Sequence, residues 1–289
     1  MCPWNEIRSE MTAAKILGII AGGGSFPLLV AQNARKQGYR VAAAAFEKET
    51  HPEIQAYTDQ LVWLKLGQLG KLIRFLQQAG VSHVVFAGPI NKPRAFDLRP
   101  DFRAIKLLVN LRSRNDNALL SSVADELHRE GLEVISAIEF VPELISPAGL
   151  QSRRAPSFAE KKDILFAWPI IKQIGSLDIG QCIVVKERAV VAVEAIEGTD
   201  RAILRAGELS GSSLTVVKIF KPGQDQRIDL PALGSQTVRT MIQAGATCLA
   251  YESGTSLFFD RAEAVSLADE HKICLVGIDP DNPEAVQNL

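Results

Sequence analysis

The densest group of side chains capable of chemistry lies in residues 218–231, where a strand-like sequence passes into a loop rich in proline and glycine. The group contains two lysines, an arginine and two aspartates: Lys218, Lys221, Arg227, Asp225 and Asp229. Cations neutralise the charge that develops on a leaving phosphate, and carboxylates hold a magnesium ion or orient water. The segment therefore predicts a site for diphosphate hydrolysis, with a solvated, salt-bridged turn as the simpler alternative.

A second polar group, residues 194–201, follows another strand-like stretch. Glu194 ends this strand, and Thr199 or Asp200 begins a helix. Glu194, Glu197 and Asp200 are candidate ligands for Mg²⁺, which keeps several waters and needs only one or two protein carboxylates. Glu197 and Asp200 also suit a purely structural role as helix caps.

The N-terminal region offers a phosphate-binding pattern of a different kind. A short apolar run at residues 15–21 ends in the glycine-rich turn of residues 22–27, and apolar residues at helical spacing follow. Such a turn lets a phosphate approach the backbone closely, and the helix after it offers free N–H groups. With Glu47 after the next strand, the pattern is also similar to a dinucleotide fingerprint, although Pro27 stands where a small residue belongs. A tight turn without a ligand is the alternative interpretation.

Two further segments are predicted to lie at the same edge of a parallel sheet, because ligands bind beyond the carboxyl ends of its strands. The loop of residues 88–94 follows a strand and contains Asn91, and the cations of Lys92 and Arg94 suit phosphate oxygens. Asp116 opens a helix, where it serves either as a cap or as a polar contact of the site.

The order of the elements predicts an α/β fold with two domains. In residues 12–145 strands alternate with helices, which predicts a Rossmann-like nucleotide-binding domain built on a parallel sheet. Residues 146–157 hold two prolines, a glycine and adjacent arginines, and are predicted to be a linker. Residues 158–280 open with a helix and continue with a hairpin and further strands and helices, which predicts a catalytic, mixed α/β domain. Residues 279–289 are expected to form a polar tail.

The expected elements can be given by their residue ranges. The expected strands are residues 15–21, 40–46, 82–87, 132–136, 181–185, 189–195, 214–220, 247–252 and 273–278. The expected helices that follow clear 3.6-residue periodicity include residues 102–111, 117–130, 158–174, 235–244 and 261–271.

The composition of the 289 residues is that of an ordinary globular enzyme, with 47% apolar and 22% charged residues. The formal net charge of −1 excludes a global electrostatic footprint for nucleic acid.

Three of the four cysteines, Cys182, Cys248 and Cys274, lie in apolar runs and are expected to be buried, reduced thiols. We expect a cytoplasmic protein, because no apolar run is long enough to span a membrane and the polar N-terminus does not read as a signal peptide. Met1 and Met11 are both compatible with the true start.

Several enzyme classes are excluded by missing motifs. The sequence contains no HExxH, no GxSxG and no Walker A lysine motif, which argues against classical serine hydrolases and P-loop enzymes. Two alternatives to diphosphate hydrolysis remain open. One is an NAD(P)-dependent oxidoreductase, favoured by the glycine turn but lacking a Tyr-x-x-x-Lys proton donor. The other is a non-catalytic nucleotide-sugar binding protein.

Three stretches together resemble the LpxI family, the UDP-2,3-diacylglucosamine pyrophosphatases of lipid A biosynthesis. They are residues 18–27, GIIAGGGSFP, residues 194–200, EAIEGTD, and residues 218–231. The resemblance extends over nearly the whole chain from residue 15 to residue 278. It implies a two-domain fold with the site between the domains, and a magnesium-dependent hydrolysis of UDP-2,3-diacylglucosamine to UMP and 2,3-diacylglucosamine 1-phosphate, lipid X.

The resemblance also implies roles for individual residues. Asp225 would be the catalytic metal ligand or water-orienting base, and Lys218 and Lys221 would stabilise phosphate charge. The residues expected to bind substrate are Gly23, Gly24, Ser25, Asn91, Asp116, Gly198, Thr199 and Arg227, and the expected metal ligands are Asp225, Glu194, Glu197 and Asp200. One departure is Asn117, which stands where the family pattern leads us to expect a carboxylate beside Asp116.

A substrate with two acyl chains would need an apolar groove. The helix expected at residues 158–174 carries an apolar stripe that either lines such a groove or belongs to the core: Phe158, Leu165, Phe166, Trp168 and Ile171. The enzyme would collect its substrate by transient contact with the surface of the inner membrane, as a peripheral protein. The sequence is compatible with a homodimer.

Overall fold

The computed structural model describes residues 15–90, 99–110 and 116–289. The chain divides into two compact units, one ending at Val141 and the other beginning at Pro142. Each unit has its own sheet, and each is described by itself.

The N-terminal unit is built on a five-stranded parallel sheet of order β3-β2-β1-β4-β5. Its strands are β1 Ile16–Ala21, β2 Arg40–Phe46, β3 Gln60–Leu64, β4 His83–Ala87 and β5 Glu133–Val134. The parallel sheet predicted for this part of the chain is thus confirmed. The sequence interpretation missed β3, since this edge strand is only partly buried and Trp63 is 39% exposed.

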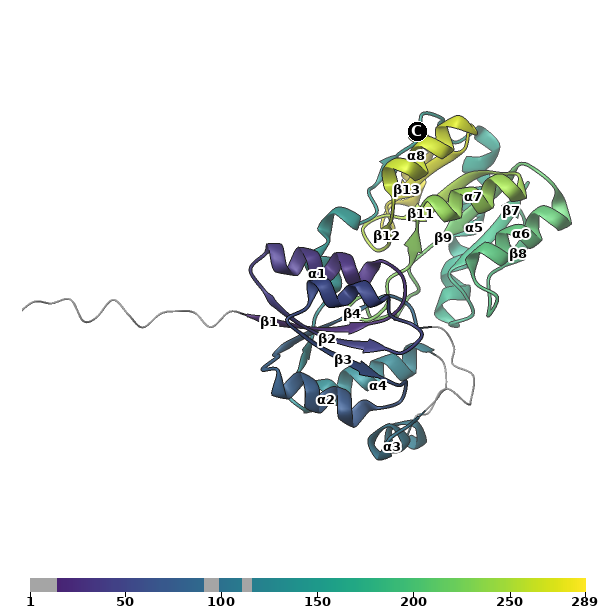
Figure 1. The fold of residues 1–289 in the computed structure, drawn as a ribbon. Helices are drawn as coiled ribbons and strands as arrows, with labels where there is room; N and C mark the ends of the chain where they lie inside the picture. Colours follow the sequence, from purple (N-terminus) through teal and green to yellow (C-terminus); the bar gives the residue numbers. More distant parts are fainter. Residues whose placement is uncertain (1–14, 91–98, 111–115) are drawn as a thin grey trace, which may run out of the picture. The chain divides into compact units, whose positions relative to one another are not determined.

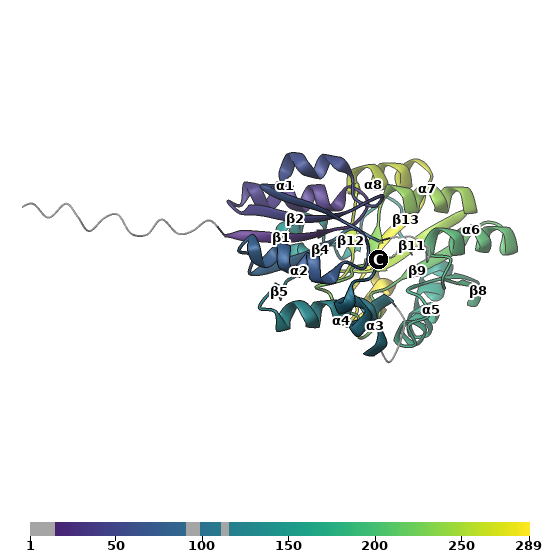
Figure 2. The ribbon, with the colours of Figure 1, turned by 60° about the horizontal axis from the view of Figure 1, so that its bottom comes forward.

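Helices cover both faces of this sheet. They are α1 Phe26–Lys36, α2 Leu69–Gln78, α3 Phe102–Asn110 and α4 Asp116–Arg129, with short 3-10 helices η1 Pro52–Tyr57 and η2 Ala137–Phe140. Helix α1 covers one face, and α2 and α4 cover the other (Figure 1). Figure 2 shows the same layers from a second direction. This is the sandwich that alternating strands and helices are expected to form.

The C-terminal unit is built on a six-stranded mixed sheet of order β6-β13-β11-β9-β7-β8. Its strands are β6 Gly149–Leu150, β7 Cys182–Lys186, β8 Ala189–Val193, β9 Leu214–Lys218, β11 Ala246–Glu252 and β13 Cys274–Ile278. Strands β9, β11 and β13 are parallel, and the β7–β8 hairpin pairs antiparallel with β9. The mixed α/β fold predicted for this part of the chain is confirmed. A separate pair, β10 Ala232–Leu233 and β12 Leu257–Phe258, is also parallel.

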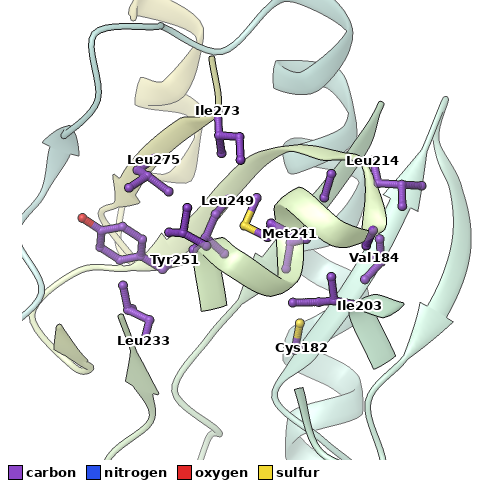
Figure 3. Close-up of a cluster of buried hydrophobic side chains, with 14 of the residues drawn as sticks. Cys182, Val184, Ile203, Leu214, Leu233, Met241, Leu249, Tyr251, Ile273 and Leu275 are labelled. Carbon is purple, nitrogen blue, oxygen red and sulfur yellow. The ribbon is translucent and has the colours of Figure 1, made fainter. Parts of the chain in front are cut away.

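Alternating side chains of the central strands divide the core of this unit into two layers. The helices are α5 Phe158–Ser176, α6 Thr199–Ser210, α7 Ser235–Ala244 and α8 Arg261–Glu270, and the 3-10 helices are η3 Pro142–Leu144 and η4 Pro283–Asn288. Leu249 and Tyr251 of β11 pack with α6, α7 and α8, whereas Cys248 and Ala250 pack with α5. Figure 3 shows the first layer, with Met241 beside Leu249.

Two segments are more structured than their composition suggests. In the predicted linker, Gly149–Leu150 forms β6, which pairs antiparallel with β13, and Arg154 pairs with the buried Glu160. The prediction of a polar tail is wrong for the end of the chain. These residues form η4, and Val286 is only 2% exposed because it packs in the α5 layer of the core.

The structure confirms that the three cysteines expected to be buried are buried. Cys182, Cys248 and Cys274 are free thiols in β7, β11 and β13 with no exposed surface. Burial raises the pKa of the Cys182 thiol well above its usual range. These cysteines therefore act as small apolar core residues.

Candidate functional site

A pocket of about 510 Å³ opens in the C-terminal unit where the first turns of α6 and α7 lie next to the end of β9. Its lining residues are Glu197, Gly198, Thr199, Asp200, Arg201, Lys218, Ala232, Leu233, Gly234, Ser235, Gln236, Thr237, Phe259 and Asp260. The volume is that of an ordinary small-molecule site, and two lysine or arginine side chains contribute to it. The pocket lies at the carboxyl end of β9, the edge at which open α/β sheets bind ligands.

Glycine precedes each of the two helices whose first turns line the pocket. Gly198 has a φ of 84°, which only glycine adopts without strain, and an added Cβ would meet no atom within 4 Å. At Gly234 an added Cβ would lie 2.9 Å from the carbonyl oxygen of Phe259, so glycine allows a close backbone approach there. Because neither N-cap residue has a side chain, the first-turn N–H groups of α6 and α7 receive no cap from that position. These groups favour an anion.

Lys218 is the buried cation of the pocket. It is 4% exposed, and its Nζ donates to the carbonyl oxygen of Ala232 at 2.6 Å and to Thr199 Oγ1 at 3.2 Å. Thr199 Oγ1 in turn donates to Glu194 Oε1 at 3.0 Å, and Glu194 Oε2 accepts from the backbone N–H of Gln181 at 3.4 Å. A cation beside the positive ends of two helices opposes the dipole arrangement that stabilises a fold. A bound anion would relieve that repulsion, so this geometry favours a ligand such as phosphate.

Carboxylates share the pocket with these positive groups. Asp200 and Asp260 both line it. Glu197 lines it too, but its carboxylate is paired with Arg205 at 2.6 Å. A hydrogen bond from its own backbone N–H and the Arg205 guanidinium lower the pKa of Glu197. This mixture of charges suits a phosphate group that carries a divalent cation better than it suits a bare anion.

The metal ligands expected from the sequence are not gathered into one cluster. Over the described ranges, no group of three or more histidine, cysteine, aspartate or glutamate side chains is placed to hold a metal ion. Glu194 accepts hydrogen bonds from protein groups, and Glu197 is paired with Arg205. Asp200 remains as a pocket-lining carboxylate. These residues do not form an all-protein cage, but they fit Mg²⁺ bound through substrate phosphates and one or two carboxylates.

Asp225, Lys221 and Arg227 lie on the loop of residues 219–231 and are not among the residues that line the pocket. The loop starts and ends at the pocket, because Lys218 Nζ bonds to the carbonyl oxygen of Ala232. Arg227 Nη2 lies 2.6 Å from Asp225 Oδ2, and these hydrogen bonds hold the pKa of Asp225 below its usual range. Lys221 Nζ pairs with Asp178 Oδ1 at 2.6 Å.

Glu252, at the end of β11, anchors the start of the same loop. The carboxylate is 4% exposed and accepts from the backbone N–H of Phe220 at 3.2 Å and from Lys172 Nζ at 2.6 Å. The pair ties the end of β9 to α5 and fixes the point at which the loop leaves the pocket.

In the N-terminal unit the glycine-rich turn packs against protein backbone. An added Cβ at Gly22 would lie 2.4 Å from the carbonyl oxygen of Gly88, and the N–H of Gly23 donates to Pro89 at 2.7 Å. Gly24 and Ser25 at the start of α1 are exposed. The first two glycines therefore serve the contact between two loops, and the exposed pair is the part of the turn open to a ligand.

Two predicted substrate contacts lie beyond what the structure describes. Asn91 falls in residues 91–98, outside the described residues, together with Lys92 and Arg94. Asp116 begins α4, as the sequence pattern predicted for a helix start, but its side chain also lies outside the described part.

The sequence interpretation missed one half of the pocket. It singled out Gly198, Thr199 and Lys218, but gave no role to Ser235, Thr237 or Asp260. A signal was present, because Gly-Ser-Gln-Thr at residues 234–237 places a glycine and two hydroxyls at a helix start, as Gly198 and Thr199 do.

The apolar stripe of α5 is mainly core. Ile171 is fully buried, Trp168 is 5% exposed, and Leu165 and Phe166 pack against the same cluster. Phe158 is the exception, at 74% exposed. The stripe therefore does not line an open groove.

The two sheets define an α/β protein with one parallel and one mixed sheet, and its C-terminal unit holds a polar pocket lined by both cations and carboxylates. The chain belongs to the LpxI family, since the model of the LpxI N-terminal domain matches residues 16–144 and that of the LpxI C-terminal domain matches residues 147–276. It is 34% identical to the UDP-2,3-diacylglucosamine pyrophosphatase LpxI of Caulobacter vibrioides over 275 residues, which cover 91% of this chain and 98% of that protein.

Similarity to solved structures is partial. An ADP complex of N5-carboxyaminoimidazole ribonucleotide synthetase is 14% identical with a TM-score of 0.28, over 70% of this chain and 45% of that chain. The multifunctional pyruvate carboxylase from Rhizobium etli is 12% identical with a TM-score of 0.27, over 48% of this chain and 14% of that chain.

Proposed function

We propose that this chain hydrolyses the diphosphate of UDP-2,3-diacylglucosamine and gives UMP and 2,3-diacylglucosamine 1-phosphate, a step in lipid A biosynthesis. Membership of the LpxI family and the activity named for the Caulobacter relative support the proposal. The structural observation that carries it is the buried Lys218, which lines one pocket together with the first turns of two helices.

The reaction places its main electrostatic demand on phosphate oxygens. A water oxygen forms a bond to one phosphorus and the water gives up its proton to solvent, while the bridging P–O bond breaks and negative charge collects on the departing phosphate. Fixed donors aimed at such charge contribute about 3–4 kcal/mol each to lowering the barrier in comparable sites. Lys218 and the first-turn N–H groups of α6 and α7 are donors of this kind, and they are held by the fold before substrate binds.

Thr199 and Glu194 act as positioning residues for Lys218. The Glu194 carboxylate accepts from the Thr199 hydroxyl, whose oxygen accepts from Lys218 Nζ. The ammonium group of Lys218 has three N–H donors, and Thr199 Oγ1 and the carbonyl oxygen of Ala232 accept from two of them. Within the described ranges the third has no hydrogen bond, and we propose that it donates to a phosphate oxygen in the pocket.

The family resemblance implies that Asp225 is a metal ligand or water-orienting carboxylate, and although it does not line the pocket, it lies on the loop that starts and ends there. Its pKa, lowered by Arg227, keeps it ionised at neutral pH and makes it a weak base. This favours holding a cation or orienting water over accepting a proton. We propose that Mg²⁺ is required, with Asp200 as the pocket carboxylate that would help to hold it. A bound Mg²⁺ supplies charge neutralisation at the phosphate oxygens.

The test is to incubate the purified full-length chain with UDP-2,3-diacylglucosamine and Mg²⁺ and to follow the products by phosphorus NMR and mass spectrometry. The proposal predicts UMP and 2,3-diacylglucosamine 1-phosphate in equal amounts, and loss of turnover when EDTA removes the metal. Saturable binding of substrate without UMP would instead identify a non-catalytic binding protein and overturn the proposal.

The substrate carries two acyl chains, so we further propose that the enzyme acts at the surface of the inner membrane as a peripheral protein. No helix in the described part of the chain is long and apolar enough to cross a bilayer.

A further inference from the structure

Helix α3 of the N-terminal unit presents an apolar face to solvent. Phe102 is 84% exposed, Val109 77%, Ile105 47% and Leu108 43%. Successive residues of a helix turn by about 100°, so these four side chains occupy one continuous side of α3. The other described helices carry at most one large exposed apolar side chain each, such as Phe158 in α5 or Leu209 in α6.

The polar groups of α3 hold it in this orientation. Asp101, just before the helix, accepts from the backbone N–H of Ala104 at 3.0 Å and from that of Gly70 in α2 at 2.6 Å. Arg103 pairs with Glu130 of α4 at 2.7 Å. Ala104 faces inward at 8% exposed. A surface helix normally turns its apolar side to the core and its charges to water, whereas α3 uses its charges to attach and leaves its apolar side outside.

The charge of α3 complements an anionic surface. Residues 102–110 contain no carboxylate, and of their two cations Arg103 pairs with Glu126 and Glu130, so Lys106 supplies the charge of the exposed side. Lys106 is exposed and follows Phe102 by one helical turn, so it flanks the apolar face. Exposed apolar side chains bordered by cations are typical of helices that lie in the interface of a bilayer rather than across it.

We infer that the apolar face of α3, formed by Phe102, Ile105, Leu108 and Val109, docks onto an anionic lipid bilayer with Lys106 beside the headgroups. The reason for such docking rests on the proposed function, because a substrate with two acyl chains resides in a membrane. The docking itself needs only the surface of α3. A nine-residue helix offers a weak, reversible attachment, which suits an enzyme that visits the membrane.

The test is flotation of the full-length chain with vesicles that contain phosphatidylglycerol, compared with vesicles of phosphatidylcholine alone. The variant Phe102→Ser with Val109→Ser should bind the anionic vesicles at least about tenfold more weakly, since burial of these two side chains supplies much of the attachment. Lys106→Gln should reduce binding about fivefold and weaken its dependence on salt. The matched control, Leu177→Ser with Leu209→Ser, removes two exposed leucines elsewhere and should bind like the wild type.

Turnover separates this inference from the proposed function. The α3 variant should hydrolyse substrate in detergent micelles at the wild-type rate and substrate in vesicles much more slowly. If no form of the substrate is hydrolysed, the proposed function fails while vesicle binding still tests α3. Equal flotation of the α3 variant and the wild type would overturn the inference. The inference would also be overturned if sedimentation velocity showed a dimer for the wild type and a monomer for the α3 variant, because a second copy of the chain would then cover the apolar face.

Discussion

Replacing Lys218 by methionine should abolish most of the activity while leaving the fold intact. An ammonium about 4 Å from a phosphate charge at an effective dielectric constant of about 20 contributes about 4 kcal/mol. At about 1.4 kcal/mol per factor of ten, kcat/KM should fall by roughly 10³. Removal of a single fixed donor from other active sites has an effect of similar size, about 10²–10³.

The stability of the variant should change much less than its activity. Methionine loses the charge-assisted bonds to Thr199 and Ala232, about 1.5–3 kcal/mol each. The loss is offset because a buried ammonium costs several kcal/mol of desolvation and faces the positive ends of α6 and α7. We expect a net change within about 2 kcal/mol, or a shift in Tm of a few degrees.

The assay is steady-state release of UMP by the wild type, Lys218→Met and a control, Lys186→Met, with Tm measured for all three. Lys186 is a fair control because its Nζ donates to the carbonyl oxygen of Ser210, at the other end of α6, at 2.8 Å. The control should keep its activity. Pyrophosphate with Mg²⁺ should raise the Tm of the wild type and of the control but not that of Lys218→Met. If Lys218→Met kept kcat/KM within about threefold of the wild type, Lys218 would not face the reacting phosphate.

Three further predictions concern Thr199, Asp225 and Glu160. Thr199→Val should lower kcat/KM about 10–100-fold, because it leaves the buried Glu194 without its hydroxyl donor, and Thr199→Ser should restore most of the activity; equal rates for the two variants would refute the positioning role. Asp225→Ala should lower kcat at least about 10³-fold with UMP affinity nearly unchanged by calorimetry, and a fully active variant would remove Asp225 from the mechanism. Burial opposes ionisation of Glu160, but hydrogen bonds from Arg154 and Thr247 outweigh it and lower the pKa of Glu160, so its contribution to stability is present above about pH 4.3 and is lost as pH falls through the lowered pKa. Urea unfolding between pH 3 and pH 7 should therefore show Glu160→Gln less stable at neutral pH, with the difference shrinking in acid; a constant difference would contradict this assignment.

Local pattern was sufficient to predict most of the fold. The apolar run, glycine turn and helical spacing of residues 15–36 predict β1, the turn and α1, and the structure confirms all three. The same is true of the β7–β8 hairpin. Periodicity failed where burial is partial, as in β3, and where a polar segment packs onto a distant surface, as η4 does through Val286.

The candidate site was only partly predictable because its geometry depends on long-range contacts. Lys218 and Thr199 were singled out by residue type, but only the packing of α6 beside β9 brings Lys218 Nζ to 3.2 Å from Thr199 Oγ1. The glycines of residues 22–23 suggested a phosphate, which stays a prediction, and the structure shows that they also pack against backbone at Gly88 and Pro89. A sequence also does not show which arginine pairs with which carboxylate, such as Arg205 with Glu197 and Arg227 with Asp225, and the metal-ligand role of both carboxylates stays a prediction.

The central claim is that the diphosphate binds in the pocket between the first turns of α6 and α7. The most direct test is a titration of the isotope-labelled protein with methylenediphosphonate, a diphosphate that cannot be hydrolysed, in the presence of Mg²⁺, followed by amide NMR. The largest shifts should appear at Thr199, Asp200, Ser235 and Gln236, and Lys218→Met should remove them. If methylenediphosphonate saturated the active enzyme without moving these amide signals, the diphosphate would not bind in this pocket.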